Sequence, residues 1–143
     1  MEGRAPVTVV VDTGPLYALI DHSDSWHNRV VKWWRGNSER VVVPVCVLSE
    51  VCFLLHTRIS PDAEASFVSA VAEGQFEIEP LEHEDFERID AIMTKYADVE
   101  LNFVDAAVAA TAERLDAETL LTTDRKHFSV IRPKHASAFQ LSP

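Results

Sequence analysis

Cysteine, long apolar runs and basic residues are all scarce in this sequence, and each scarcity excludes a class of protein. Cys46 and Cys52 are the only two cysteines, and their spacing fits neither a redox pair nor a zinc knuckle. We therefore expect two small buried apolar side chains in a reducing compartment, with no disulfide between them. The longest aliphatic runs, such as 9–11 and 41–43, are too short to cross a bilayer, and residues 1–20 show no signal-peptide pattern. These absences predict a cytoplasmic protein without a membrane partner.

The histidines are few as well, and none of the six has the spacing of a helical zinc site, so any bound metal is expected to have oxygen ligands. Basic residues number 13 against 23 acidic ones, and the net charge of -10 argues on its own against a nucleic-acid partner. The acidity is regional, however, because residues 60–100 hold 12 acids and two bases, whereas the rest of the chain is balanced. Most of these acids are interpreted as solvated helix faces. The charge distribution is therefore compatible with a basic surface near the C-terminal end of the sequence.

Apolar residues for a globular core are abundant. Apolar residues make up 47% of the 143 residues and charged residues 25%, which is an ordinary balance for a globular protein. A chain of this length can bury a core without disulfides or a structural metal. We therefore expect one domain over 1–143, without linkers or internal repeats.

Strand and helix patterns alternate along the chain. Apolar and β-branched runs predict strands at 7–11, 40–43, 76–79 and 119–123, with a fifth at 130–131. Apolar spacing and capping residues predict helices at 16–20, 25–36, 44–55, 60–74, 84–96 and from 102 onward, and a turn at 124–128. The helix from 44 is apolar nearly all round and is expected to be buried, and Trp33 and Trp34 are interpreted as core or interface anchors. This alternation predicts an α/β sandwich with a mainly parallel sheet.

Two of the predicted strands run directly into a carboxylate. Asp12 follows the β-branched strand at 7–11, which should be covered on both faces and therefore central. Thr13 can cap the helix that comes next, and Gly14 frees the turn. Asp124 follows the strand at 119–123 in the same manner. In parallel sheets, ligands and chemistry collect at the carboxyl ends of the strands.

Two further acids follow predicted helix starts by a few residues. Glu50 lies in the apolar helix from 44, where a carboxylate is costly unless it is paired or bound to a cation. Taken alone, it is equally well explained as an acid on a wet edge of that helix. Asp105 lies in the first turn of the helix from 102, where the helix dipole favours a negative charge, and taken alone it is simply a suitable first-turn residue. Helices that follow strands begin at the edge where Asp12 and Asp124 are expected.

Convergence of these four carboxylates would demand either protonation or a cation, because like charges at close range cannot all stay ionised. Hard oxygen ligands favour Mg²⁺, with Mn²⁺ as a substitute. Such an ion can activate a water and stabilise the charge of a phosphodiester during in-line displacement. The pattern therefore indicates metal-dependent hydrolysis of a phosphodiester.

These acids lie in segments that resemble, in the right order, the four motifs of PIN-domain nucleases. The segments are V-V-D-T at 10–13, S-E-V at 49–51, F-V-D-A-A-V-A-A-T-A-E-R-L at 103–115 and L-L-T-T-D-R-K-H-F at 120–128. The last two are particularly similar to those of VapC toxins from bacterial toxin–antitoxin pairs. The resemblance implies a three-layer α/β/α sandwich with a sheet of four to five strands and a Mg²⁺- or Mn²⁺-dependent endoribonuclease site.

Carried over by position, the resemblance implies a catalytic and metal-binding quartet with Asp12 and Asp105 as its surest ligands; its members are Asp12, Glu50, Asp105 and Asp124. Thr13 and Thr122 match hydroxyl positions that orient these acids or the attacking water. Asp98 matches a recurring acid of the family and is interpreted as structural.

The family also implies partners. These are an RNA substrate, a second copy of the chain in a homodimer, and a small VapB-like antitoxin whose C-terminal segment occupies the groove, often with a basic residue at the acids. We hypothesise that RNA phosphates contact Arg125, Lys126, Arg132 and Lys134, with Arg29, Lys32 and Arg35 as a second candidate patch.

Three alternatives compete with this interpretation. A haloacid-dehalogenase-like phosphatase needs a second aspartate where Gly14 stands, and a receiver domain needs a lysine after its last strand, where Arg125 and Lys126 occupy a predicted turn. The strongest alternative is a catalytically silent PIN-like module that binds protein or RNA, although none of the four acids is missing.

Overall fold

The central element is a five-stranded sheet in which every neighbouring pair of strands is parallel. The computed structural model describes residues 7–143; residues 1–6, part of the stretch without a signal-peptide pattern, lie outside this description. The strands are β1 (Thr8–Val11), β2 (Arg40–Pro44), β3 (Glu77–Glu79), β4 (Thr119–Leu121) and β5 (Gln140–Ser142). Their order across the sheet is β3-β2-β1-β4-β5, so β1 is central, as predicted.

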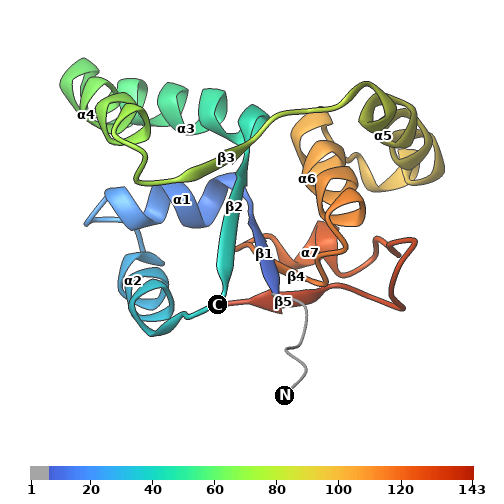
Figure 1. Cartoon of the computed structure of the whole chain (residues 1–143). Helices are drawn as coiled ribbons and strands as arrows, with labels where there is room; N and C mark the ends of the chain where they lie inside the picture. The colour runs from blue at the N-terminus through green and yellow to red at the C-terminus, as the bar shows by residue number, and fades with distance from the viewer. Residues whose placement is uncertain (1–6) are drawn as a thin grey trace.

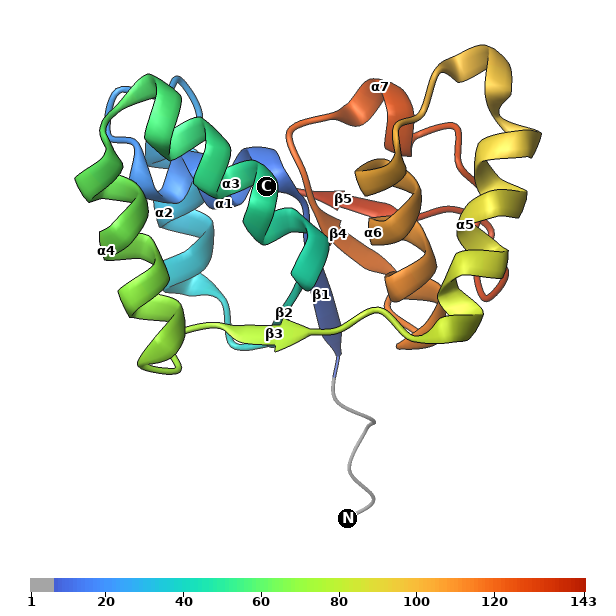
Figure 2. The same cartoon turned by 90° about the horizontal axis from the view of Figure 1, so that it is seen from above.

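Helices cover the sheet on both sides. They are α1 (Thr13–Ile20), α2 (His27–Gly36), α3 (Val45–Arg58), α4 (Pro61–Ala72), α5 (His83–Lys95), α6 (Phe103–Arg114) and α7 (Arg125–Phe128), with a 3₁₀ turn, η1, at Ala97–Val99. Figures 1 and 2 show α1 to α4 on one side of the central strands and α5 to α7 on the other. The predicted α/β sandwich is confirmed. Within residues 7–143, no helix combines the length and the apolar character needed to cross a bilayer.

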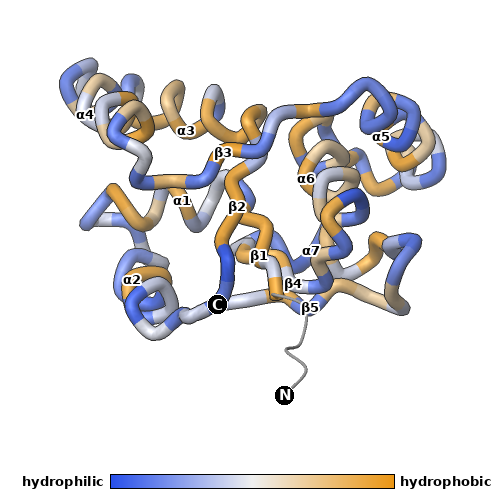
Figure 3. Tube along the Cα trace, viewed as in Figure 1, coloured by the Kyte–Doolittle hydropathy of each residue, from blue (hydrophilic) through white to orange (hydrophobic). Residues whose placement is uncertain are grey.

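The core is built around β1, whose four residues are all buried. In Figure 3 the tube is orange along β1 and most of β2, while the outer turns of α4 and α5 carry much blue. The alanines of α6 are buried, and their small side chains let this helix approach β1 and β2 closely. Asp105, in the first turn of α6, is thereby brought close to the carboxyl end of β1.

The fifth strand was predicted at the wrong place. Val130 and Ile131 follow α7 without pairing in the sheet, and Ile131 is buried as part of the hydrophobic core. The fifth strand is instead β5, which pairs with β4 in the register Leu120↔Leu141. β5 is short, lies at the sheet edge and has no run of apolar residues, so its backbone pairing left no pattern in the sequence. The predicted turn at 124–128 also contains a single helical turn, α7.

Helix α3 is not buried all round, contrary to prediction. Its inner face is buried, but Val45 is 40% exposed and Phe53 is 64% exposed. Cys46 and Cys52 are free thiols and are only partly buried. An apolar helix face in contact with water indicates an interaction surface rather than core.

The helices outside the centre confirm one other expectation and qualify another. Trp33 and Trp34 are partly buried and pack against the core, as anchors should. Most acids of residues 60–100 are at least partly exposed, but Asp85 is buried. The Arg114 guanidinium pairs with it at 3.0 Å (Nε to Oδ1), which compensates the buried charge and ties α5 to α6.

Candidate active site

Asp12 stands at the carboxyl end of β1, where the strand passes into α1. Its backbone N–H donates to the carbonyl of Leu121, which fixes it beside β4. The carboxylate is only 6% exposed, and its Oδ2 accepts a hydrogen bond from Thr122 Oγ1 at 2.9 Å. Burial raises the pKa of Asp12 to about 6, although hydrogen bonds from the Thr13 backbone and the Thr122 hydroxyl act in the opposite direction.

Asp105 is held by the N-terminus of α6 through a capping box. Asn102 Oδ1 accepts from the Asp105 backbone N–H at 2.8 Å, and Asp105 Oδ2 accepts from the Asn102 N–H at 3.3 Å. The side chain is buried, and burial raises the pKa of Asp105. Repulsion from Asp124 and Glu50 raises this pKa further, while the Asn102 hydrogen bond and His127 lower it. The cap therefore fixes the carboxylate without neutralising it.

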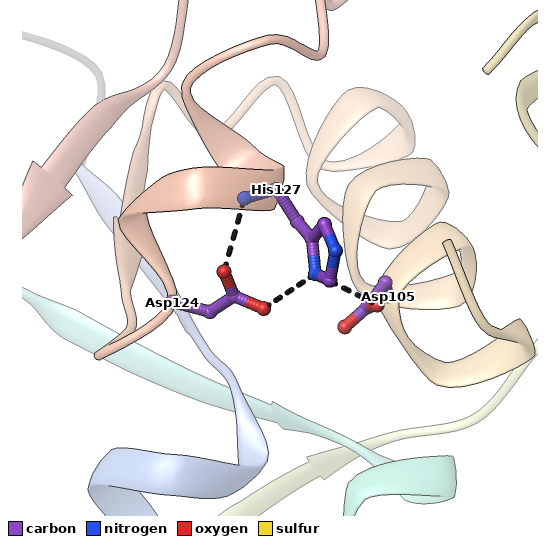
Figure 4. Close-up of side chains that lie close together, drawn as sticks. All are labelled: Asp105, Asp124 and His127. Carbon is purple, nitrogen blue, oxygen red and sulfur yellow. Dashed lines mark hydrogen bonds and ion pairs between the residues drawn. The ribbon is translucent and has the colours of Figure 1, made fainter. Parts of the chain in front are cut away.

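Asp124 caps the short helix α7 and contacts His127 with both carboxylate oxygens. Its Oδ1 accepts from the His127 backbone N–H at 3.0 Å, and its Oδ2 lies 2.7 Å from His127 Nδ1. The same Nδ1 lies 3.7 Å from Asp105 Oδ2, so the imidazole stands between the two carboxylates (Figure 4). The Asp124 backbone N–H donates to Thr122 Oγ1 at 2.9 Å. Thr122 thus joins the acids at the ends of β1 and β4.

Glu50 reaches the same region from α3. Thr13 Oγ1 donates to Glu50 Oε1 at 2.6 Å, and both residues line a cavity of about 380 Å³. Burial, together with the charges of Glu50 and Asp12, raises the pKa of the nearby Cys46 thiol to about 11. Cys46 therefore lies within electrostatic reach of both acids. The two threonines singled out from the sequence each donate a hydrogen bond to one acid of the quartet.

The four acids form one electrostatic group. Asp105 and Asp124 both raise the pKa of Asp12 by repulsion, and Glu50 acts on Asp105. Within residues 7–143, no lysine or arginine lies within 4.0 Å of any of these carboxylates. Asp105 and Asp124 lie at ligand distance from each other with His127 between them, whereas Asp12 and Glu50 are linked to them through electrostatic coupling.

A divalent cation fits this donor set. Ligand atoms of Asp105, Asp124 and His127 all lie within 4.8 Å of one another, and the buried carboxylate of Asp12 adds another oxygen donor nearby. A cation would relieve the repulsion that raises the pKa values of Asp12 and Asp105. The site offers oxygen ligands, as expected, together with one imidazole that was not expected.

His127 is the residue that sequence reasoning missed. Metalloprotease spacing requires a pair of histidines, whereas His127 is a single histidine three residues after an aspartate. On one turn of helix, this i, i+3 spacing places both side chains on the same face. The D-R-K-H order at 124–127 therefore contained the signal, once 124–128 is read as a helical turn.

The remaining predicted residues lie around this centre. Asp98 is exposed in η1, and within residues 7–143 it forms no ion pair with a basic side chain. Arg125 and Lys126 are exposed on α7, directly after Asp124. Arg132 and Lys134 lie in the loop that follows, where Lys134 lines a cavity between α5 and α6.

The second basic patch lies at the end of α2. Arg29 and Lys32 line a cavity of about 560 Å³ there with Trp33, and Arg35 is exposed on the same helix. Pro143 lines this cavity and accepts a hydrogen bond from Arg125 Nη2 at 2.8 Å. The two candidate patches are therefore neighbours, joined at the end of β5.

Comparison with known proteins places this site in a family. The PIN domain model matches residues 9–132, which include all four acids. The chain is 32% identical over 135 residues to Ribonuclease VapC26 of Mycobacterium tuberculosis, covering 94% of this chain and 100% of that protein. The crystal structure of Mycobacterium tuberculosis VapC20, described as a sarcin-ricin loop cleaving toxin, superposes with a TM-score of 0.72 at 21% identity, over 78% of this chain and 86% of that one. VapBC2 from Rickettsia felis, bound to a promoter DNA fragment, gives a TM-score of 0.67 at 18% identity, over 95% and 98%. The two structures show a shared fold, while the family match and the 32% identical relative show that the chain belongs to the PIN-domain family and, within it, to the VapC ribonucleases.

Proposed function

We propose that this protein is a divalent-metal-dependent endoribonuclease and the toxin of a toxin–antitoxin pair. The observation that carries the proposal is the meeting of Asp12, Glu50, Asp105 and Asp124 at one sheet edge without a lysine or arginine partner in residues 7–143. A metal site explains why so much buried negative charge is kept together. The family relationship supports RNA hydrolysis as its use.

The chain's own residues have distinct roles in this proposal. Asp105 and Asp124 hold the ion together with Asp12, whose carboxylate is oriented by the Thr122 hydroxyl. A bound Mg²⁺ or Mn²⁺ supplies an activated water and stabilises the charge that builds up on the phosphodiester. Glu50, oriented by Thr13, lines a cavity with Thr13, Ser49, Phe53 and Leu54, and this cavity is the proposed entry point of the RNA strand.

RNA is the proposed substrate, and the proposed phosphate contacts begin at α7. Arg125 and Lys126 are exposed and follow Asp124 directly, so they can bind phosphates on either side of the scissile bond. Arg132 and Lys134 lie farther along the same loop, and Lys134 shares its cavity with Glu84 and Glu113 among other acids. We therefore expect Arg125 and Lys126 to contribute most to the electrostatic part of binding.

The antitoxin is the proposed occupant of an apolar groove between α3 and α4. The groove has a volume of about 320 Å³ and is lined by Val45, Leu48, Ser49, Cys52, Phe67, Val68 and Val71. Ser49 also lines the cavity of Glu50, so the groove leads to the acids. A short antitoxin segment with apolar residues in the groove and a basic residue at Glu50 matches both surfaces. A solved structure of similar fold from Klebsiella pneumoniae is a toxin–antitoxin complex, with a TM-score of 0.65 at 21% identity over 86% of this chain and 92% of that one.

Two further parts of the proposal concern the chain as a whole. We propose a homodimer, in which the exposed and stacked rings of Phe86 and Phe103 would be covered by the second copy. We also propose that residues 1–143 form one domain, and a cytoplasmic location stays a prediction.

The test is cleavage of total cellular RNA by the purified protein, with Mg²⁺ or Mn²⁺ and with EDTA. The matched pair of variants is Asp12→Asn in the site and Asp90→Asn at an exposed aspartate of α5. We expect discrete products that EDTA abolishes, that Asp12→Asn lacks and that Asp90→Asn retains. Equal cleavage by Asp12→Asn would assign the activity to another site or a contaminant. A wild-type protein that yields no metal-dependent products would be a silent PIN-like binding module.

A further inference from the structure

We propose that His127 is a direct ligand of the metal ion and that its imidazole makes the site favour Mn²⁺ over Mg²⁺. The inference rests on the metal-dependent function proposed above and adds a nitrogen ligand to an otherwise all-carboxylate centre. It concerns one residue, so it can fail while the nuclease function stands.

The geometry places one nitrogen atom opposite two carboxylates. His127 Nδ1 lies 2.7 Å from Asp124 Oδ2 and 3.7 Å from Asp105 Oδ2. Bonds from a divalent ion to nitrogen or oxygen are about 2.1 Å long, so one ion can reach two atoms that are up to about 4 Å apart. Both separations from Nδ1 lie within this limit, and the ligand atoms of the three side chains all lie within 4.8 Å of one another. The three side chains converge on a common point from α6 and α7 (Figure 4).

The backbone fixes the imidazole in this position. Asp124 Oδ1 caps α7 by accepting from the His127 N–H, so the helical turn that carries the ring starts at one of its own co-ligands. The side chain of His127 is 25% exposed, which leaves it accessible to an ion from solution while packing restricts its orientation. A ligand held in place before the ion arrives loses little conformational entropy on binding.

A role limited to orienting Asp124 would explain less. Such a histidine needs only the 2.7 Å contact, whereas Nδ1 also faces Asp105 on α6. With no lysine or arginine within 4.0 Å of either acid in residues 7–143, His127 is the group that bridges these two carboxylates. An ion bound there would take the place of the Nδ1 proton, which would be released to solvent, and the remaining ring proton would be on Nε2.

Ligand chemistry then sets the choice of ion. Mg²⁺ prefers oxygen donors in a near-ideal octahedron and gives up its water reluctantly. Imidazole nitrogen is a good ligand for first-row transition ions, whose affinities follow a series that begins with Mn²⁺. A nitrogen in the first coordination sphere therefore increases the affinity for Mn²⁺ more than the affinity for Mg²⁺.

The test is pulsed electron paramagnetic resonance of Mn²⁺ bound to the full-length, metal-free protein, made once with natural histidine and once with ¹⁵N-histidine. We expect a directly bound histidine nitrogen in the electron spin-echo modulation, replaced by a ¹⁵N signal in the labelled protein. His127→Gln should abolish this signal and weaken Mn²⁺ binding at least about tenfold, with a much smaller change for Mg²⁺ in a competition titration. His83→Gln, at an exposed histidine of α5, is the matched control and should retain the signal.

A wild-type spectrum in which bound Mn²⁺ shows no histidine nitrogen would overturn the inference and leave RNA cleavage unaffected. Absence of any Mn²⁺ binding, together with EDTA-insensitive cleavage, would overturn the proposed function as well. The wild-type spectrum is decisive without a variant, so poor folding of His127→Gln leaves the test intact.

Discussion

Replacing Asp12 with asparagine should stabilise the metal-free protein while it removes the nuclease activity. Asp12 is 6% exposed, and burial raises its pKa from 3.8 to about 6. Each pKa unit corresponds to about 1.4 kcal/mol, so the ionised carboxylate costs the folded state about 3 kcal/mol. Asparagine has a similar shape, carries no charge and can still accept the hydrogen bond from Thr122. The variant should therefore be more stable by up to about 3 kcal/mol.

The gain should depend on pH in a defined window. Between pH 4 and 6, the folded state binds a proton at Asp12 that the unfolded state has already released, so wild-type stability falls as the pH rises through this window. The advantage of Asp12→Asn should thus be absent near pH 4, increase up to pH 6 and stay constant above it. At pH 7.5 it should appear as a rise in Tm of roughly 10 °C.

Urea or thermal unfolding in EDTA at pH 4.5, 6 and 7.5 measures this effect. Asp90→Asn, at an exposed aspartate, should differ little from wild type at any of these pH values. Adding Mn²⁺ should stabilise wild type and bring it closer to Asp12→Asn, because the ion neutralises the same charge. A destabilised Asp12→Asn variant, or a gain that does not change with pH, would refute the assignment of Asp12 as a buried and uncompensated carboxylate.

Three further predictions follow from other contacts. Arg114→Ala leaves the buried Asp85 unpaired and should lower the free energy of unfolding in urea by about 3–5 kcal/mol, while the Mn²⁺ affinity of the folded protein stays unchanged. A decrease of less than about 1 kcal/mol would contradict the role of Arg114 in compensating the charge of Asp85. Neutralising Arg125 and Lys126 together should weaken RNA binding. It should also reduce the magnitude of the slope of log K for RNA association against log salt concentration by about 1.4. An unchanged slope would show that these two residues do not contact RNA. Thr122→Val removes the hydroxyl between β1 and β4 and should reduce the rate of RNA cleavage about tenfold or more. Circular dichroism should show that the variant is folded. A cleavage rate equal to that of wild type would mean that the hydroxyl is not needed to orient the acids.

The parts of the fold that could be predicted are those with a strong local pattern. The run of β-branched residues at Thr8–Val11 predicts a central strand, and all four residues are buried in β1. The carboxylate that follows this run directly is easily recognised in the sequence. Asp105 was placed through the Asn102 cap, because a capping box is a local feature. Glu50 could not be placed by such rules, since its meeting with Thr13 joins residues 37 positions apart and depends on how α3 packs. The resemblance to a family supplied what local pattern could not.

The failures have physical reasons of the same kind. β5 is held by backbone pairing with β4, and Leu141 is its only apolar residue, so no periodicity marked it. The exposed Phe53 on α3 reads like a core residue, because a surface that binds a partner has the composition of a core. His127 was missed because its role depends on a helical turn of four residues, too short to be recognised from apolar spacing.

The hydrogen bond from Thr122 to Asp12 joins positions 110 residues apart and is completed by the last strands to be synthesised. On the ribosome, a nascent chain that has emerged only as far as α6 has one wall of the reaction centre and lacks the other. The centre can therefore assemble only after β4 and the residues that follow it have been made, because the sheet places β4 directly beside β1.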